Sequence, residues 1–325
     1  RRAMRIATFN VENLDEPIAP RIAVLRPALE RLEADILCLE EVNSQKRPKS
    51  SERELAALDA LIAGTPYADY ARASTLSERH GGATSAHNLV TLSRFPIIST
   101  RQVRHEKVPP AALRLVTPVP PSDAAEEIAF DRPFLVSAID IGDERLHVIN
   151  AHFRAPLASP VAGQKLGPFE WKTIGGWAEG YYLSSLKRTG QALELRLVVD
   201  DILAEDEDAK IVVAGDLNAE EYESAMRIII GAPENTGNTN LTHRSLVLLD
   251  RAISPGRRFS VIHYGRPQML DHMLASYALY GRFREIAIHN ETLGDEAIGY
   301  AKGMEAAGSY HAPLVATFAL GDDEE

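Results

Sequence analysis

Cysteine and long hydrophobic runs are scarce in this chain of 325 residues. The one cysteine, Cys38, lies inside the apolar run DILCL, where a lone thiol is more often core filler than nucleophile, and an unpaired thiol fits a reducing compartment. No apolar run approaches the roughly 20 residues that span a bilayer, and RRAMRIATFN at the N-terminus leads directly into a strand-like run without a signal-peptide core. We therefore expect no stable membrane insertion and a cytoplasmic location, with Met4 as a possible natural start; a trimmed secreted form would read the same.

Several motifs of common enzyme classes are also missing. The sequence has no GxSxG elbow, so it lacks the main signature of a serine triad. It has neither a GxGxxG nor a GxxxxGK[ST] phosphate loop. Scarce cysteine and scattered histidines give no zinc signature.

Positive charge is in short supply, with 35 Lys and Arg against 46 Asp and Glu and a formal net charge of −11. Phosphate binding normally leaves a basic footprint, so this balance argues at first against a nucleic-acid partner. However, two acidic runs at 205–208 and 322–325 hold eight of the acidic residues, which leaves a net charge of only −3 elsewhere. Both runs are most simply solvated surface, so the sequence is compatible with a locally positive cleft.

Short apolar runs alternate with helical patterns along the whole chain. Strands are predicted at 5–9, 35–39, 88–92, 134–141, 145–150, 210–215, 268–275 and 313–320. Helices are predicted at 22–32, 52–62 and about 183–203, where apolar residues recur every three or four positions. No linker separates two independently patterned halves, so we expect a single domain over 1–325 with helices packed against sheets.

Polar side chains collect where these predicted strands end. They are Asn10, Glu40 and Glu41, His152, Asp216 and Asn218, Asp271, and His311. Any single Asp after a strand is usually a turn residue, but strand-end groups from distant positions can meet at one edge of a sheet. Their number and complementary chemistry therefore indicate a site.

The chemistry of these residues is coherent. Glu41 and Asn10, with Glu12 as a less certain addition, offer hard oxygen ligands suited to Mg²⁺ or Mn²⁺. His152 and His311 can donate protons or hydrogen bonds to phosphate oxygens, while Asp216 with Asn218 could hold and deprotonate a water for in-line attack. The combination indicates phosphoester hydrolysis.

Ordered blocks across the chain resemble one known family. The blocks are TFNVENL at 8–14, ADILCLEEVN at 34–43, LSRFPI at 92–97, INAHF at 149–153, RTGQALEL at 188–195, GDLNA at 215–219, LDHMLAS at 270–276 and SYHAPLVATF at 309–318. They resemble the endonuclease/exonuclease/phosphatase superfamily, which includes deoxyribonuclease-I-like nucleases, neutral sphingomyelinases and inositol-polyphosphate phosphatases. The resemblance implies an α+β fold, a four-layer sandwich of two face-to-face, mainly antiparallel β-sheets flanked by helices.

The resemblance also implies roles for matching residues. Glu41 and Asn10 look like the metal-site pair, Asp216 and Asn218 like the pair that orients water and grips the phosphoryl group, and Asp271 like the carboxylate that fixes the catalytic His311. His152 matches the nuclease and sphingomyelinase variant of its block and is a candidate acid for the leaving oxygen. Asn43 and Arg188, in the matching blocks, are expected to contact substrate.

One position departs from the family pattern, because Tyr310 stands where an aspartate usually precedes the histidine. The change removes a negative charge near the metal and phosphate. Either a neighbouring carboxylate substitutes for it, or the enzyme uses one metal ion, or activity is reduced.

The segment at about 154–187 is the least family-like part and reads as an aromatic-rich insertion. Trp171 and Trp177 lie there among further aromatics and lysines, so they are expected to form a substrate-facing flap, or else a small core that holds down a long loop.

We expect a metal-dependent nuclease that cleaves phosphodiester bonds and needs no protein partner. The alternatives are a small-molecule or phospholipid phosphodiesterase or phosphatase, and a non-catalytic nucleic-acid-binding relative.

Overall fold

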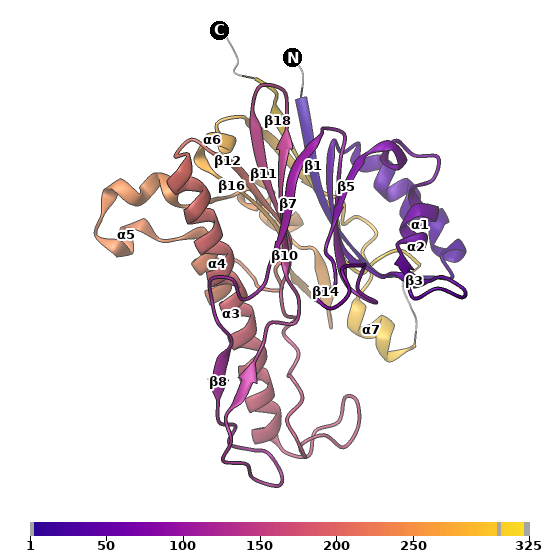
Figure 1. Ribbon diagram of the computed structural model, residues 1–325, viewed down its shortest axis with the longest axis vertical. Coiled ribbons are helices and arrows are strands. Elements are labelled where there is room, and N and C mark those ends of the chain that lie inside the picture. Colours follow the sequence, from indigo (N-terminus) through magenta and orange to yellow (C-terminus); the bar gives the residue numbers. More distant parts are fainter. Residues whose placement is uncertain (1–2, 304–306, 322–325) are drawn as a thin grey trace.

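Two six-stranded sheets pack face to face in the computed structural model, which describes residues 3–303 and 307–321 (Figure 1). The first sheet has the order β17 (Phe283–Ile288), β18 (Leu314–Ala319), β1 (Ala3–Leu14), β2 (Ile36–Val42), β6 (Asn88–Ser93) and β5 (Ala71–Ser74). The second has the order β13 (Val247–Leu248), β16 (Asp271–Ala275), β12 (Lys210–Asp216), β11 (Arg145–His152), β10 (Phe134–Asp140) and β7 (Ile97–Val103). The expected acidic tail at 322–325 lies outside the described residues.

Helices cover the outer face of each sheet, so the fold has four layers, as the sequence predicted. The α-helices are α1 (Ala19–Leu32), α2 (Ala56–Ile62), α3 (Ile174–Glu205), α4 (Ser224–Ile230), α5 (Pro233–Thr236), α6 (Tyr277–Tyr280) and α7 (Glu296–Ala301). Helices α1 and α2 pack on the first sheet, and α3 and α4 on the second. Within the described ranges, no helix combines the length and apolar character needed to cross a bilayer.

Small elements occupy the connections. The short hairpins are β3 (Gln45–Lys46) with β4 (Arg53–Glu54), β8 (Ala111–Leu113) with β9 (Glu126–Ile128), and β14 (Val261–His263) with β15 (Arg266–Gln268). Single 3₁₀ turns lie at Pro66–Asp69, Thr239–Arg244, Leu249–Ala252 and Pro255–Arg257.

The longest helix departs from the sequence prediction. α3 begins at Ile174 rather than near residue 183, because the hydroxyl of Thr173 accepts a hydrogen bond from the Gly176 N–H (2.9 Å) and caps an earlier start. Its first turns project beyond the sheets beside β8 and β9 (Figure 1). The last part of the expected aromatic insertion, 174–187, is therefore helical.

Strand direction decides where the strand-end residues meet. Each sheet contains one parallel pair, β1 with β2 and β11 with β12, and all its other strand pairs are antiparallel. Parallel strands end at the same edge, and their antiparallel neighbours β16 and β18 begin there. Polar residues at the ends of β1, β2, β11 and β12 are thereby brought beside those at the starts of β16 and β18.

Apolar side chains fill the space between the sheets. Ile6, Cys38, Val148, Val212 and Phe318 belong to this buried cluster. Burial raises the pKa of the Cys38 thiol, so Cys38 is an inert core residue, as expected from the sequence.

An ion-pair group joins the two sheets at the edge opposite these polar strand ends. Glu144, in the turn between β10 and β11, accepts hydrogen bonds from Arg282 (2.8 Å to Oε1) and pairs with Lys210 at the start of β12 (3.0 Å). Arg282 directly precedes β17 of the other sheet. These two cations lower the pKa of the Glu144 carboxyl to about 2.

We expect Glu144→Gln to lower the free energy of unfolding by about 1 kcal/mol near pH 7. A carboxyl with a depressed folded-state pKa adds stability above its unfolded pKa, and this stability is lost as the pH falls toward 2. The difference between wild type and variant should therefore shrink between pH 5 and pH 2 in urea titrations. Glu106→Gln, at an exposed pair with Arg101, is the matched control and should change little; a pH-independent difference would contradict the assigned ion pairs.

Candidate active site

The centre of the candidate site is the carboxamide of Asn10, which links the two sheets. Its Nδ2 donates to Oε1 of Glu41 on β2 (3.1 Å) and to Oδ2 of Asp216 on β12 (3.0 Å). The second oxygen of Glu41 accepts from the backbone N–H of Asn13 (3.0 Å). Asn10 is fully buried, so its bonds to the carboxylates are protected from water. The structure thus brings together three residues predicted separately from the sequence.

His311 and Asp271 form an ion-paired dyad beside this centre. Nδ1 of His311 lies 2.8 Å from Oδ2 of Asp271 and 3.8 Å from Oδ2 of Asp216. Burial alone would lower the pKa of His311, but the charges of Asp271 and Asp216 raise it well above the usual range. The two carboxylates therefore favour the charged, imidazolium form of the ring at neutral pH.

Asp216 is buried among other carboxyl groups. Burial, together with the charge of Asp271, raises the pKa of Asp216 to about 7. Its backbone N–H donates to Oε1 of Glu40 (3.0 Å), which also accepts from the hydroxyl of Thr8 (2.7 Å). Glu40 is completely buried and burial raises its pKa, so this carboxyl serves as a support for the Asp216 backbone.

His152 lies on the other side of Asp216, with Nε2 3.4 Å from its Oδ2 and 3.8 Å from Oε1 of Glu41. The guanidinium of Arg132 contacts both ring nitrogens of His152. Burial and the charge of Arg132 lower the pKa of His152 well below its usual range. His152 is therefore a neutral imidazole, in contrast to His311.

Asn218 is fixed by the loop that follows β12. Its Nδ2 donates to the carbonyl of Phe153 (2.9 Å), and its backbone adopts the uncommon left-handed conformation (φ 49°). The carbonyl of the next residue, Ala219, is hydrogen-bonded to Nε2 of the buried His272 (2.6 Å). Nδ1 of the same ring is hydrogen-bonded to the carboxylate of Asp250 (2.5 Å). This buried pair holds the loop in its strained shape.

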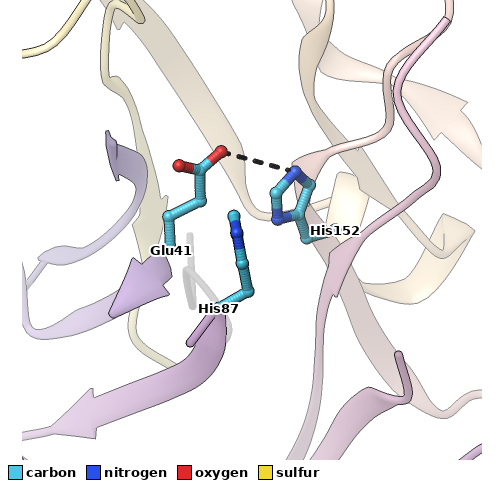
Figure 2. A group of neighbouring side chains, drawn as sticks. All are labelled: Glu41, His87 and His152. Atoms are coloured by element: carbon cyan, nitrogen blue, oxygen red, sulfur yellow. Dashed lines mark ion pairs between the residues drawn. The ribbon is translucent and has the colours of Figure 1, made fainter. Parts of the chain in front are cut away.

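A further histidine, His87, lies with Glu41 and His152 (Figure 2). Ligand atoms of the three side chains lie within 4.8 Å of one another, and the His87 and His152 rings are 6.1 Å apart. Burial lowers the pKa of His87, so this ring is neutral as well. Its backbone N–H donates to Oδ1 of Asn43 (3.0 Å).

The ring of Tyr310 lies beside Gly294 and Gly299 and packs against Tyr300 (5.4 Å between ring centroids). The carboxylate of Glu12 lies between them, because it accepts from the Tyr300 hydroxyl (2.6 Å) and the Tyr310 N–H (3.3 Å). Glu12 also comes within 4.8 Å of His311. A carboxylate, that of Glu12, is therefore present beside both His311 and the backbone of Tyr310.

The donor chemistry of the site fits a hard divalent cation. Carboxylates of Glu12, Glu41, Asp216 and Asp271 converge there, and three groups of acidic and histidine side chains are spaced to hold a metal ion. In the described part of the chain, Oδ1 of Asp271 is buried without a hydrogen-bond partner. A cation would compensate this concentration of negative charge.

Positive side chains gather beside His152, on the side of α3. Asp131 pairs with Lys187 (2.9 Å) and Arg154 (3.3 Å), and Arg132 follows it in the chain. Arg188 lies next to them and donates to the Arg154 carbonyl (3.0 Å). We name these four cations, Arg132, Arg154, Lys187 and Arg188, the basic cluster; Asp131 pairs within it, and Arg132 also faces the carboxylates of Glu41 and Asp216.

The other residues expected to contact substrate have different surroundings. Asn43 is buried and uses its side chain to tie the His87 loop to Asp15 (3.2 Å). Trp171 is partly buried and packs against a small cluster that includes Leu115 and Leu183. Trp177 is 44% exposed and stacks on Tyr181. The segment thus contains both a packing tryptophan and an accessible one.

Sequence reasoning missed His87, Arg132 and the support role of Glu40. His87 directly precedes β6 and Arg132 lies two residues before β10, so both stand at strand starts. The same strand-end signal that identified His152 could have found them, if the first residues of antiparallel strands had been given equal weight.

Comparison with known proteins identifies the family and the fold of this chain. The family model described as Endonuclease/Exonuclease/phosphatase family matches residues 7–286. A search of curated protein sequences gave no match. Similar solved structures include truncated Caenorhabditis elegans TDP2 (TM-score 0.58, 14% identity, 97% of each chain covered) and an AP endonuclease from Archaeoglobus fulgidus (TM-score 0.54, 18% identity, 97% of this chain and 99% of that chain). At these identities the likeness shows the fold.

Proposed function

Because the chain belongs to the endonuclease/exonuclease/phosphatase family, we propose that it is a divalent-metal-dependent phosphodiesterase that cleaves nucleic acid. Family and fold together support hydrolysis of a phosphoester. The observation that carries the proposal is the convergence of Asn10, Glu41, Asp216 and the His311–Asp271 dyad at one sheet edge. A neutral histidine and a charged one flank the same buried aspartate, which is an arrangement suited to acid, base and electrostatic catalysis.

Asn10 and Glu41 would hold the cation, Mg²⁺ or Mn²⁺. When bound, such an ion neutralises negative charge that develops on the phosphoryl oxygens. Glu12 would supply the negative charge that Tyr310 does not carry.

The protein groups divide the remaining work. Asp216, with its pKa near 7, orients the attacking water and accepts its proton. His311, kept charged by Asp271, donates a hydrogen bond to a phosphoryl oxygen, and Asn218 holds another. Arg132, beside His152, adds positive charge on the leaving-group side, where His152 orients the departing oxygen.

Chelation with EDTA should abolish hydrolysis of bis(4-nitrophenyl) phosphate, and added Mg²⁺ or Mn²⁺ should restore it. Glu41→Ala, Asp216→Ala and His311→Ala should each lower kcat/KM by roughly two to four orders of magnitude, the usual scale for a lost acid, base or oxyanion donor. His243→Ala, at an exposed histidine, is the control. Full activity in excess EDTA together with full activity of Glu41→Ala would falsify the mechanism.

Salt dependence separates nucleic acid from a small phosphodiester as the substrate. If three or four phosphates meet the basic cluster, kcat/KM for a single-stranded oligonucleotide should fall about 20- to 50-fold between 50 and 200 mM KCl. Turnover of bis(4-nitrophenyl) phosphate should barely change. Equal salt responses would favour a small-molecule substrate, and tight oligonucleotide binding with Mg²⁺ but no cleavage of either compound would favour a non-catalytic binding protein.

A further inference from the structure

The projecting part of α3 carries three exposed aromatic rings, those of Trp177, Tyr181 and Tyr182, and no step of the proposed reaction uses them. Trp177 and Tyr181 are 44% and 37% exposed, and their rings stack with centroids 5.4 Å apart. Buried residues of a satellite cluster, including Leu183 and Val161, support this part of the molecule. The two rings are therefore displayed on a supported element.

The two rings share a helix face with residues that contact the active-site edge. At 3.6 residues per turn, Trp177, Tyr181, Ser184 and Arg188 lie within about 60° of one another around the axis. We name them the α3 stripe. Ser184 accepts a hydrogen bond from Nε of Arg154 (3.2 Å), and Arg188 donates to the carbonyl of the same residue (3.0 Å).

Arg154 is only two residues beyond His152, so the α3 stripe faces the end of β11 that carries this histidine. With a rise of 1.5 Å per residue, the stripe runs about 16 Å from Arg188 out to Trp177. Figure 1 shows this end of α3 extending past the edge of the sheets. The rings thus continue outward from the active site on one side.

Along α3, from the active-site edge outward, positively charged side chains are followed by aromatic ones. The basic cluster lies at the inner end, and the side chains of Arg154 and Lys187 are 21% and 17% exposed, so both are within reach of a ligand. Cations followed by stacked rings are the two features that bind single-stranded nucleic acid, since phosphates meet the cations and unpaired bases stack on the rings. A paired duplex does not offer free base faces to such a stripe.

We propose that the exposed rings of the α3 stripe, Trp177 and Tyr181, and the partly exposed cations of the basic cluster, Arg154 and Lys187, form a track for an unpaired strand that leaves the active site. Ser184 and Arg188 are buried and support the track from below. This inference rests on the proposed phosphodiesterase function and narrows it to substrates with single-stranded nucleotides on one side of the scissile phosphate. At a stacked rise of 3.4 Å, the track spans about five nucleotides.

The test compares two substrates and two matched variants. The double variant Trp177→Ala with Tyr181→Ala should raise KM for a single-stranded oligothymidylate twelve nucleotides long by about 5- to 150-fold, with kcat within twofold. Its activity on bis(4-nitrophenyl) phosphate and its melting temperature should match wild type. Tyr280→Ala is the control, because Tyr280 is also 44% exposed and stacked (on Phe283), but lies on α6 at the opposite edge.

If the double variant is folded and its KM for the oligonucleotide is unchanged, the proposal that this surface binds an unpaired strand is wrong. It is also wrong if the chain hydrolyses bis(4-nitrophenyl) phosphate but binds no oligonucleotide, and in that case the phosphodiesterase function stands. If no phosphodiester is cleaved, the proposed function fails, and fluorescence anisotropy of the labelled oligonucleotide with wild type and double variant still decides the track.

Apolar side chains further out on the same projection define the competing outcome. Phe169 and Ile174 are 96% and 85% exposed, and such residues can also enter a lipid interface. Vesicles of phosphatidylcholine with phosphatidylserine provide the probe in a sedimentation assay. Vesicle binding that the double variant loses, with oligonucleotide KM unchanged, would replace the track with a membrane contact.

Discussion

The structure of the site depends on one buried amide shared between two sheets. Asn10 on the first sheet donates to Glu41 on the same sheet and to Asp216 on the other. Asp216 in turn bonds through its backbone to Glu40 of the first sheet, and Asn150 on β11 donates to the carbonyls of Leu39 (3.3 Å) and Val90 (3.1 Å). Buried polar bonds of this kind permit few alternatives, because a shift of one sheet would leave donors and acceptors unpaired in a medium of low polarity. They therefore set how the sheets meet at the active-site edge.

The same concentration of buried groups explains why His311 and His152 differ in charge. His311 faces Asp271 and Asp216 and is kept charged, whereas His152 faces the guanidinium of Arg132 and is kept neutral. Both rings approach the same carboxylate of Asp216. The same sheet edge thus holds a charged imidazolium, His311, and a neutral imidazole, His152, at neutral pH. The two differ because the charge nearest to His311 is negative and the charge nearest to His152 is positive.

Much of the fold was predictable from the sequence, since apolar runs and their spacing are local patterns. All eight predicted strands are present, and the site residues at their ends converge. Four further strands of the two main sheets, β5, β7, β13 and β17, were not predicted. β7 and β17 are largely exposed and carry few consecutive apolar residues, and β13 has only two residues. The early start of α3 was missed because Gly175, Gly176 and Gly180 weaken the helical pattern, while the cap at Thr173 and packing overcome it.

The sequence by itself determined which polar groups stand at strand ends and which chemistry they could support. It could not determine how these groups share hydrogen bonds, since Asn10 and Asp216 are 206 positions apart in the chain. Only the tertiary structure placed Arg132 and His87 beside His152, brought Glu12 beside His311, and separated the packing Trp171 from the exposed Trp177. The protonation state, the hydrogen-bond partners and the exposure of each site residue depend on its neighbours in space. Those neighbours are set by how the two sheets and α3 pack together.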